Sequence, residues 1–170
     1  GASLADPDRL CFCFIGDLAF FYDMNAIGNR HVGNNIRIML INNGKGTEFR
    51  NYFHPGQMLL GDDADRYVAA AGHYGNRSRV LVRHYAEDLG FTYLCASDKK
   101  EFERVYEQFL TPEKTPKPLL FEVWTNSDEE SEALRILRNM KSDPTGKTKH
   151  LVKQYLGPKG INFVKNILKK

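Results

Sequence analysis

The sequence predicts an α/β domain of three layers (α/β/α), in which a mostly parallel β-sheet lies between two layers of helices. Up to residue 140, short apolar runs of strand length alternate with segments of helical hydrophobic period, which is the order typical of parallel sheets. Runs such as 11–15, Cys-Phe-Cys-Phe-Ile, are apolar at every position, which favours a central strand covered on both faces. With 170 residues, 42% of them hydrophobic, the chain is long enough to bury a substantial core.

Each predicted element follows from its own pattern. Residues 1–5 are interpreted as the last turns of a helix, and apolar residues at helical spacing within 20–27 predict a short helix between the first two strands. Between residues 50 and 79 only 65–72 is predicted to be helical. Strands are predicted at 10–15, 36–41, 91–96 and 119–125, and further helices at 79–89, 99–110 and 127–140.

Local signals predict where two of these helices begin or end. Ser127 is followed three residues later by Glu130, the pattern of a capping box at a helix start. Gly33 is predicted to end the first helix as its C-cap. The pair Asn34-Asn35 then forms only the turn into the second strand.

Polar residues follow the first two strands at the point where each ends. Gly16 and Asp17 come directly after the first strand, and Asn43 comes after the second. A strand–helix–strand unit is nearly always parallel, so Asp17 and Asn43 are expected at the edge where α/β sheets bind ligands. A carboxylate, an amide oxygen and the turn carbonyl of Lys45 suit Mg²⁺ and leave positions for a diphosphate. The N-terminus of the helix entered near Phe20 would face the same anion.

This combination resembles the cofactor motif of the thiamine diphosphate enzymes, in which Gly-Asp is followed by Asn-Asn a little over twenty residues later, here Asn42-Asn43. The resemblance implies a diphosphate-binding (PP-type) domain with thiamine diphosphate and Mg²⁺ as cofactors. It implies that Asp17, Asn43 and the main-chain oxygen of Lys45 hold the metal.

The same resemblance assigns roles around the motif. Gly16, Leu18 and Ala19 would lie along the diphosphate, although most members of the family have a glycine where this chain has Leu18. Glu48 and Phe49 follow the turn, where family members contact cofactor and substrate, so both are candidate catalytic residues. Glu48 is a departure, because the menaquinone-pathway branch of the family is apolar there.

The resemblance is strongest to that menaquinone-pathway branch and implies a 2-oxo acid decarboxylase or carboligase, a transferase or lyase. The expected partners are a pyrimidine-binding domain, in the same protein or a second subunit, and a 2-oxo acid substrate, within a homodimer or tetramer. We therefore expect a piece of a larger enzyme that is inactive on its own.

Other readings stay open. They are the cofactor-binding subunit of a split decarboxylase, an enzyme of surface-polysaccharide synthesis, and a non-catalytic interaction module. Replacing Asp17 by Ala in the full-length protein would separate enzyme from module, because only the enzyme would lose a metal-dependent activity.

Composition argues against several other classes of protein: disulfide-bonded, zinc-binding, membrane-spanning and nucleic-acid-binding. Cys11, Cys13 and Cys95 are odd in number and lie in apolar runs, which favours reduced, buried thiols in a cytoplasmic protein over disulfides or a zinc site. No apolar run approaches the roughly 18 residues of a membrane span.

Residues 141–170 hold eight lysines and one aspartate, a formal charge of +7, and are predicted as a basic helical tail after the domain 1–140. A docking role is favoured over nucleic-acid binding, because no arginine or aromatic cluster accompanies the lysines.

Overall fold

The computed structural model describes residues 1–47, 54–63 and 77–140. The chain divides into two compact units, Gly1–Ser131 and Glu132–Lys170, and the fold described below is that of the first. The candidates Glu48 and Phe49, the helix predicted at 65–72 and the tail 141–170 lie outside the described residues. Those expectations therefore stay predictions.

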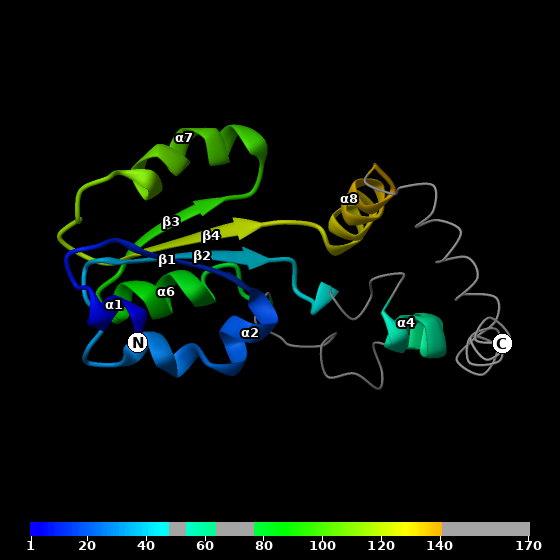
Figure 1. Ribbon diagram of the computed structural model, residues 1–170, viewed down its shortest axis with the longest axis horizontal. Helices are drawn as coiled ribbons and strands as arrows, with labels where there is room; N and C mark the ends of the chain where they lie inside the picture. Colours follow the sequence, from blue (N-terminus) through cyan, green and yellow to red (C-terminus); the bar gives the residue numbers. More distant parts are fainter. Residues whose placement is uncertain (48–53, 64–76, 141–170) are drawn as a thin grey trace, which may run out of the picture. The chain divides into compact units, whose positions relative to one another are not determined.

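A parallel sheet of four strands forms the centre of the first unit. Its strands are β1 (Cys11–Gly16), β2 (Ile36–Asn42), β3 (Thr92–Ala96) and β4 (Leu119–Trp124). Their order is β1-β2-β4-β3, and every neighbouring pair within the described residues is parallel. All four predicted strands are confirmed, and the carboxyl ends of β1, β2 and β4 meet at one edge of the sheet (Figure 1).

The helices of the described residues are α1 (Ala2–Ala5), α2 (Asp17–Tyr22), η1 (Met24–Gly28), α4 (Pro55–Leu60), η2 (Gly61–Asp63), α6 (Leu81–Asp88), α7 (Lys99–Leu110) and α8 (Ser127–Met140). Three of them cover the two faces of the sheet, with α7 on one side and α2 and α6 on the other (Figure 1). Phe109 of α7 packs with Phe121 in one core, and Phe20 of α2 packs with Val82 of α6 in the other. The predicted three-layer architecture is confirmed.

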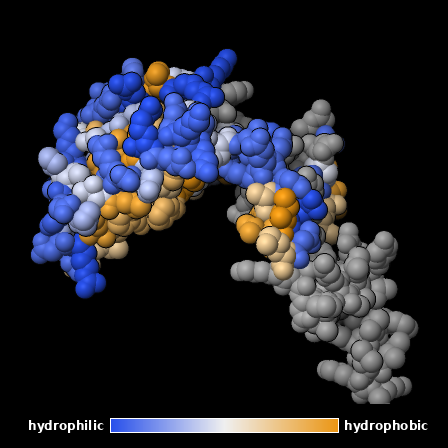
Figure 2. All heavy atoms as spheres, turned by 90° about the horizontal axis from the view of Figure 1, so that it is seen from above, coloured by the Kyte–Doolittle hydropathy of each residue, from blue (hydrophilic) through white to orange (hydrophobic). Residues whose placement is uncertain are grey.

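The prediction that the first strand is central and covered on both faces is wrong. β1 is an edge strand, with β2 as its only neighbour among the described residues. Its side chains Phe12 and Phe14 are 39% and 67% exposed. The prediction of buried thiols is also wrong for Cys13 of β1 and Cys95 of β3, which are both exposed. Figure 2 shows hydrophobic residues, in orange, along one margin of the larger group of coloured atoms and at other places on the described surface. A continuously apolar run therefore does not by itself place a strand at the centre of a sheet.

The start of α8 also differs from the prediction. The side-chain oxygen of Asn126 accepts hydrogen bonds from the main-chain N–H groups of Asp128 (2.9 Å) and Glu129 (3.1 Å). Asn126 therefore caps the helix one residue before the predicted cap, and the capping box of Ser127 and Glu130 is wrong. Since the cap is already supplied, the carboxylate of Glu130 is left to make other contacts.

Two further local predictions are corrected. A helix, α4, forms where none was predicted, because Nδ1 of His54 accepts a hydrogen bond from Gly56 N at 3.1 Å and proline occupies its first turn. Gly33 caps no helix, since the preceding 3-10 helix η1 already ends at Gly28.

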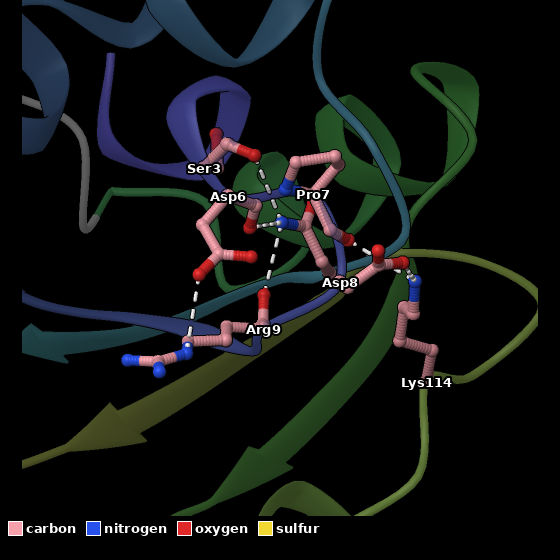
Figure 3. Close-up of polar contacts among 7 residues, drawn as sticks. Ser3, Asp6, Pro7, Asp8, Arg9 and Lys114 are labelled. Atoms are coloured by element: carbon pink, nitrogen blue, oxygen red, sulfur yellow. Dashed lines mark hydrogen bonds and ion pairs between the residues drawn. The ribbon is translucent and has the colours of Figure 1, made fainter.

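The Asn34-Asn35 pair forms the predicted turn, and Asn35 has a structural role besides. Its buried side-chain amide donates to the main-chain oxygens of Ser3 and Arg9, each at 3.0 Å. Figure 3 shows these oxygens turned toward a shared donor, beside the ion pair of Lys114 with Asp8 at 3.0 Å. Asn35 thereby anchors the segment that leads into β1.

A buried arginine lies under α7, where the pattern predicts only an apolar strand. Arg37 of β2 is 0% exposed. Its guanidinium donates to the main-chain oxygens of Phe109, Thr111 and Glu113, each at 2.6 Å. Burial lowers the pKa of Arg37 from its ordinary value, and the negative charge of Glu113 partly opposes that change. The side chain thus satisfies carbonyl groups that the end of a helix leaves free.

Candidate functional site

Asp17 joins the ends of the first two strands. It is the first residue of α2, directly after β1, and its side chain is 2% exposed. The carboxylate accepts hydrogen bonds from the main-chain N–H groups of Leu18 (2.8 Å), Asn43 (3.1 Å) and Gly44 (2.5 Å). Asp17 and Asn43 therefore lie together at the carboxyl ends of neighbouring parallel strands, as expected from the strand–helix–strand pattern. The helix begins at Asp17 and not near Phe20.

Asn43 is held on both sides of its amide group. Its Oδ1 accepts a hydrogen bond from the main-chain N–H of Lys45 at 2.9 Å. Its Nδ2 donates to Thr47 Oγ1 and to Glu130 Oε2, both at 2.7 Å. Thr47 Oγ1 donates in turn to Ser127 Oγ at 3.0 Å. The turn after β2 is thus tied to the start of α8.

A pocket of about 450 Å³ opens at this edge of the sheet. All six side chains or main-chain segments predicted to bind the cofactor line it, namely Gly16, Asp17, Leu18, Ala19, Asn43 and Lys45. Thr47 and Glu130 line it as well. The structure therefore brings the predicted residues together, and it adds Glu130, which sequence reasoning missed.

A signal for Glu130 was present in the chain. β4 pairs with β2, so the residues that follow β4 reach the same edge as Asn43. Thr125 and Glu130 are polar residues just after that strand. The pairing of β2 with β4 joins strands far apart in sequence, and without it Glu130 was assigned to a helix cap.

A second carboxylate lies beneath the site. Glu122 of β4 is 0% exposed and accepts hydrogen bonds from Asn42 Nδ2 and from the hydroxyl of Tyr93, both at 2.6 Å. Burial raises the pKa of Glu122, and the charge of Asp17 adds to that, whereas both hydrogen bonds and the charge of Arg79 oppose it. Because Asn42 directly precedes Asn43, the hydrogen bond between Asn42 and Glu122 holds the end of β2 in place beside the site.

The donor set at the pocket consists mainly of neutral oxygens. Within the described residues no three His, Cys, Asp or Glu side chains are grouped as a metal cluster. The predicted ligands contain one carboxylate, that of Asp17, with an amide oxygen and a carbonyl. Such a set suits Mg²⁺, which takes one or two carboxylates and completes its shell with phosphate oxygens and water.

Comparison with known families agrees with this geometry. Residues 1–123 match the family described as "Thiamine pyrophosphate enzyme, C-terminal TPP binding domain". The chain belongs to this family. The predicted family and fold are thereby confirmed, as is thiamine diphosphate as the cofactor, and Mg²⁺ is typical of thiamine diphosphate enzymes.

Curated relatives of this thiamine diphosphate domain share one name, 2-succinyl-5-enolpyruvyl-6-hydroxy-3-cyclohexene-1-carboxylate synthase. The protein of Bacteroides fragilis is 37% identical over 131 residues, which is 77% of this chain and 22% of the relative. That of Phocaeicola vulgatus is also 37% identical over 131 residues, with the same coverage. That of Desulfotalea psychrophila is 46% identical over 55 residues, 32% of this chain and 10% of the relative. The chain thus spans about a fifth of the length of the first two relatives.

The thiamine diphosphate family also implies an enzyme of several domains or subunits, since it describes one domain by its position in a longer protein. In the described part of the chain, none of the helices has the length and apolar character needed to cross a membrane.

Proposed function

We propose that this chain is the cofactor-binding domain of a synthase of menaquinone biosynthesis, a transferase or lyase that decarboxylates a 2-oxo acid and joins the product to an acceptor. The shared name of the curated relatives supports this choice. The observation that carries it is the meeting of Asp17 and Asn43 at the ends of two adjacent parallel strands, within one pocket.

The proposed metal ligands are a carboxylate oxygen of Asp17, Oδ1 of Asn43 and the main-chain oxygen of Lys45. Asn43 Oδ1 accepts one N–H group at 2.9 Å, and the Lys45 oxygen accepts one from Thr47 at 3.0 Å. Each of these oxygens has two lone pairs, so each retains one for a cation. With the carboxylate of Asp17, these two oxygens form a donor set of the kind that Mg²⁺ takes, with positions left for diphosphate and water.

Gly16, Leu18 and Ala19 are proposed to lie along the diphosphate. A Cβ added to Gly16 would have no heavy atom within 4 Å, so there is open space beside the backbone at this point. When bound, thiamine diphosphate supplies the stabilised carbanion that carries the chemistry. The residues of this chain bind the metal and the diphosphate and thereby orient the reactive ring. Glu48 and Phe49 remain candidates for contact with the substrate.

The rest of the active site is proposed to come from a pyrimidine-binding domain, in the same protein or in a second subunit of a homodimer or tetramer. This accounts for the family's description of the chain as one domain of a longer enzyme. We also propose a cytoplasmic location, since Cys11, Cys13 and Cys95 are all unpaired and such thiols persist in a reducing compartment.

Nuclear magnetic resonance of the 170-residue chain tests the cofactor site. Thiamine diphosphate with Mg²⁺ should bind weakly and shift the backbone amide signals of Asp17, Asn43 and Gly44. Asp17→Asn keeps an acceptor oxygen but loses the charge. The affinity for Mg²⁺, measured from the shifts that depend on it, should therefore fall by at least about tenfold. Asp88→Asn, at an exposed position of α6, serves as the matched control and should respond like the wild type. Unmoved signals in the wild type, or equal shifts in Asp17→Asn, would refute the proposal.

A further inference from the structure

The amide group of Asn43 has two ends that are hard to distinguish by shape, yet only its oxygen can bind a cation. Three neighbours contact this amide: the main-chain N–H of Lys45, the hydroxyl of Thr47 and the carboxylate of Glu130. Which end faces which neighbour therefore decides whether Asn43 can be a metal ligand at all.

The chemistry of the neighbours settles the orientation. A hydroxyl such as that of Thr47 both donates and accepts, so it tolerates either end of the amide. The N–H of Lys45 can only donate, and an ionised carboxylate can only accept. Glu130 Oε2, 2.7 Å from Asn43 Nδ2, therefore requires the NH₂ group on its side and leaves the oxygen on the side of Lys45.

Glu130 is itself held in place. The hydroxyl of Thr125 donates to its other carboxylate oxygen, Oε1. The main-chain N–H of Thr125 donates to the oxygen of Asn42 at 3.1 Å, which ties this segment to the end of β2. With Asn126 capping α8, the carboxylate is not required by the helix. Glu130 is thus a fixed acceptor facing Asn43 from the first turn of α8.

We propose that Glu130 is a positioning residue for the metal, which acts by holding the amide of Asn43 with its oxygen free for the cation. This inference rests on the proposed function, because it needs Asn43 to be a ligand. Partners of this kind, behind a ligand, commonly change metal affinity by 10- to 100-fold when they are removed, an order-of-magnitude range.

Two variants separate orientation from charge. In Glu130→Gln the side-chain oxygen can still accept from Asn43 Nδ2, and the new NH₂ group can donate to the hydroxyl of Thr125. Glu130→Ala removes the acceptor altogether. Glu129→Ala is the matched control, since it removes a carboxylate from the exposed neighbouring position of the same helix turn.

The affinity for Mn²⁺, with thiamine diphosphate present, is measured by electron paramagnetic resonance on the full chain. Glu130→Ala should weaken Mn²⁺ binding by about tenfold or more, whereas Glu130→Gln should stay within about threefold of the wild type. Glu129→Ala should match the wild type. Equal losses in Glu130→Gln and Glu130→Ala would show that only charge matters and would overturn the proposal, as would unchanged binding in Glu130→Ala.

The side-chain NH₂ signals of Asn43, observed without metal, give a second readout. They should move toward the positions of a solvent-exposed amide in Glu130→Ala and stay in place in Glu130→Gln, and unmoved signals in both variants would overturn the proposal. If the wild type binds no Mn²⁺ at Asp17 and Asn43, the proposed function fails and the inference with it. If the wild type binds and Glu130→Ala binds equally well, only the inference fails.

Discussion

Asp17 has a role in the fold, and in the proposed function the same side chain also binds the metal. Its carboxylate binds N–H groups from α2 and from the turn after β2, so it links two segments separated by a helix and a strand. A carboxylate this buried is stabilised only where donors or cations surround it. The same position that secures the sheet edge therefore presents an anionic oxygen to the pocket.

The buried carboxyl group of Glu122 should make the free energy of unfolding depend on pH. Burial raises the pKa of its carboxyl above the ordinary 4.5. Between 4.5 and the raised value the folded protein binds more protons than the unfolded chain, so the free energy of unfolding falls as pH rises through that window. Glu122→Gln cannot titrate, so its stability relative to the wild type should increase with pH. Urea unfolding between about pH 4 and pH 8 measures this difference.

A control for this titration is Glu129→Gln, which changes an exposed carboxylate on α8. Its stability relative to the wild type should stay nearly constant over the same pH range. A constant difference for Glu122→Gln as well would mean that Glu122 does not carry the effect.

At the scale of elements, Arg37 connects β2 to the end of α7. Its guanidinium supplies donors to three main-chain oxygens in and after the last turn of the helix. Arg37→Ala should lower the free energy of unfolding by about 3 kcal/mol, because buried carbonyl groups lose their partners. Urea unfolding followed by the fluorescence of Trp124, the single tryptophan, measures the change.

The comparison for Arg37 is Arg83→Ala on α6. Arg83 forms an ion pair with Glu87 at 3.0 Å, and both side chains are about half exposed, so its loss should cost less than about 1 kcal/mol. Similar losses in the two variants would contradict the structural role of Arg37.

At the scale of the whole described fold, the sheet is protected unevenly. The inner strands β2 and β4 are covered by helices on both faces, whereas β1 lies at the edge with Phe14 67% exposed. Phe20 of α2, in the core cluster against which Ile15 of β1 packs, is 3% exposed. The free energy of unfolding should therefore depend much more on the side of β1 that packs against α2 than on the side that carries Phe14.

This asymmetry can be measured with a matched pair of substitutions. Phe14→Ser should change the free energy of unfolding by less than about 0.5 kcal/mol, because little of the side chain is buried. Phe20→Ala should cost about 3–5 kcal/mol by leaving a cavity in the core. If the two variants are equally destabilised in urea, the exposure of Phe14 on β1 is refuted.

Much of the fold and of the candidate site can be predicted from local patterns. The strands at 36–41 and 91–96 and the helix at 99–110 lie within a residue of the observed elements, because hydrophobic period and caps act over a few positions. Leu18, Asn43 and Lys45 line the predicted pocket for the same reason, since they directly follow strands or their turns. Arg37, Glu122 and Glu130 were missed, because their partners come from distant segments.

The sequence by itself determined the succession of strands and helices, the family, and the meeting of Asp17 with Asn43. β1 and β2 follow one another after one short connection, and strands joined in this way prefer to lie side by side, so their ends converge. Only the tertiary structure decided that β4 lies beside β2, which leaves β1 at the edge and brings Glu130 to Asn43 and Glu122 to Asn42. That order depends on which buried surfaces fit together across the sheet, a property of the packed chain and not of any short segment.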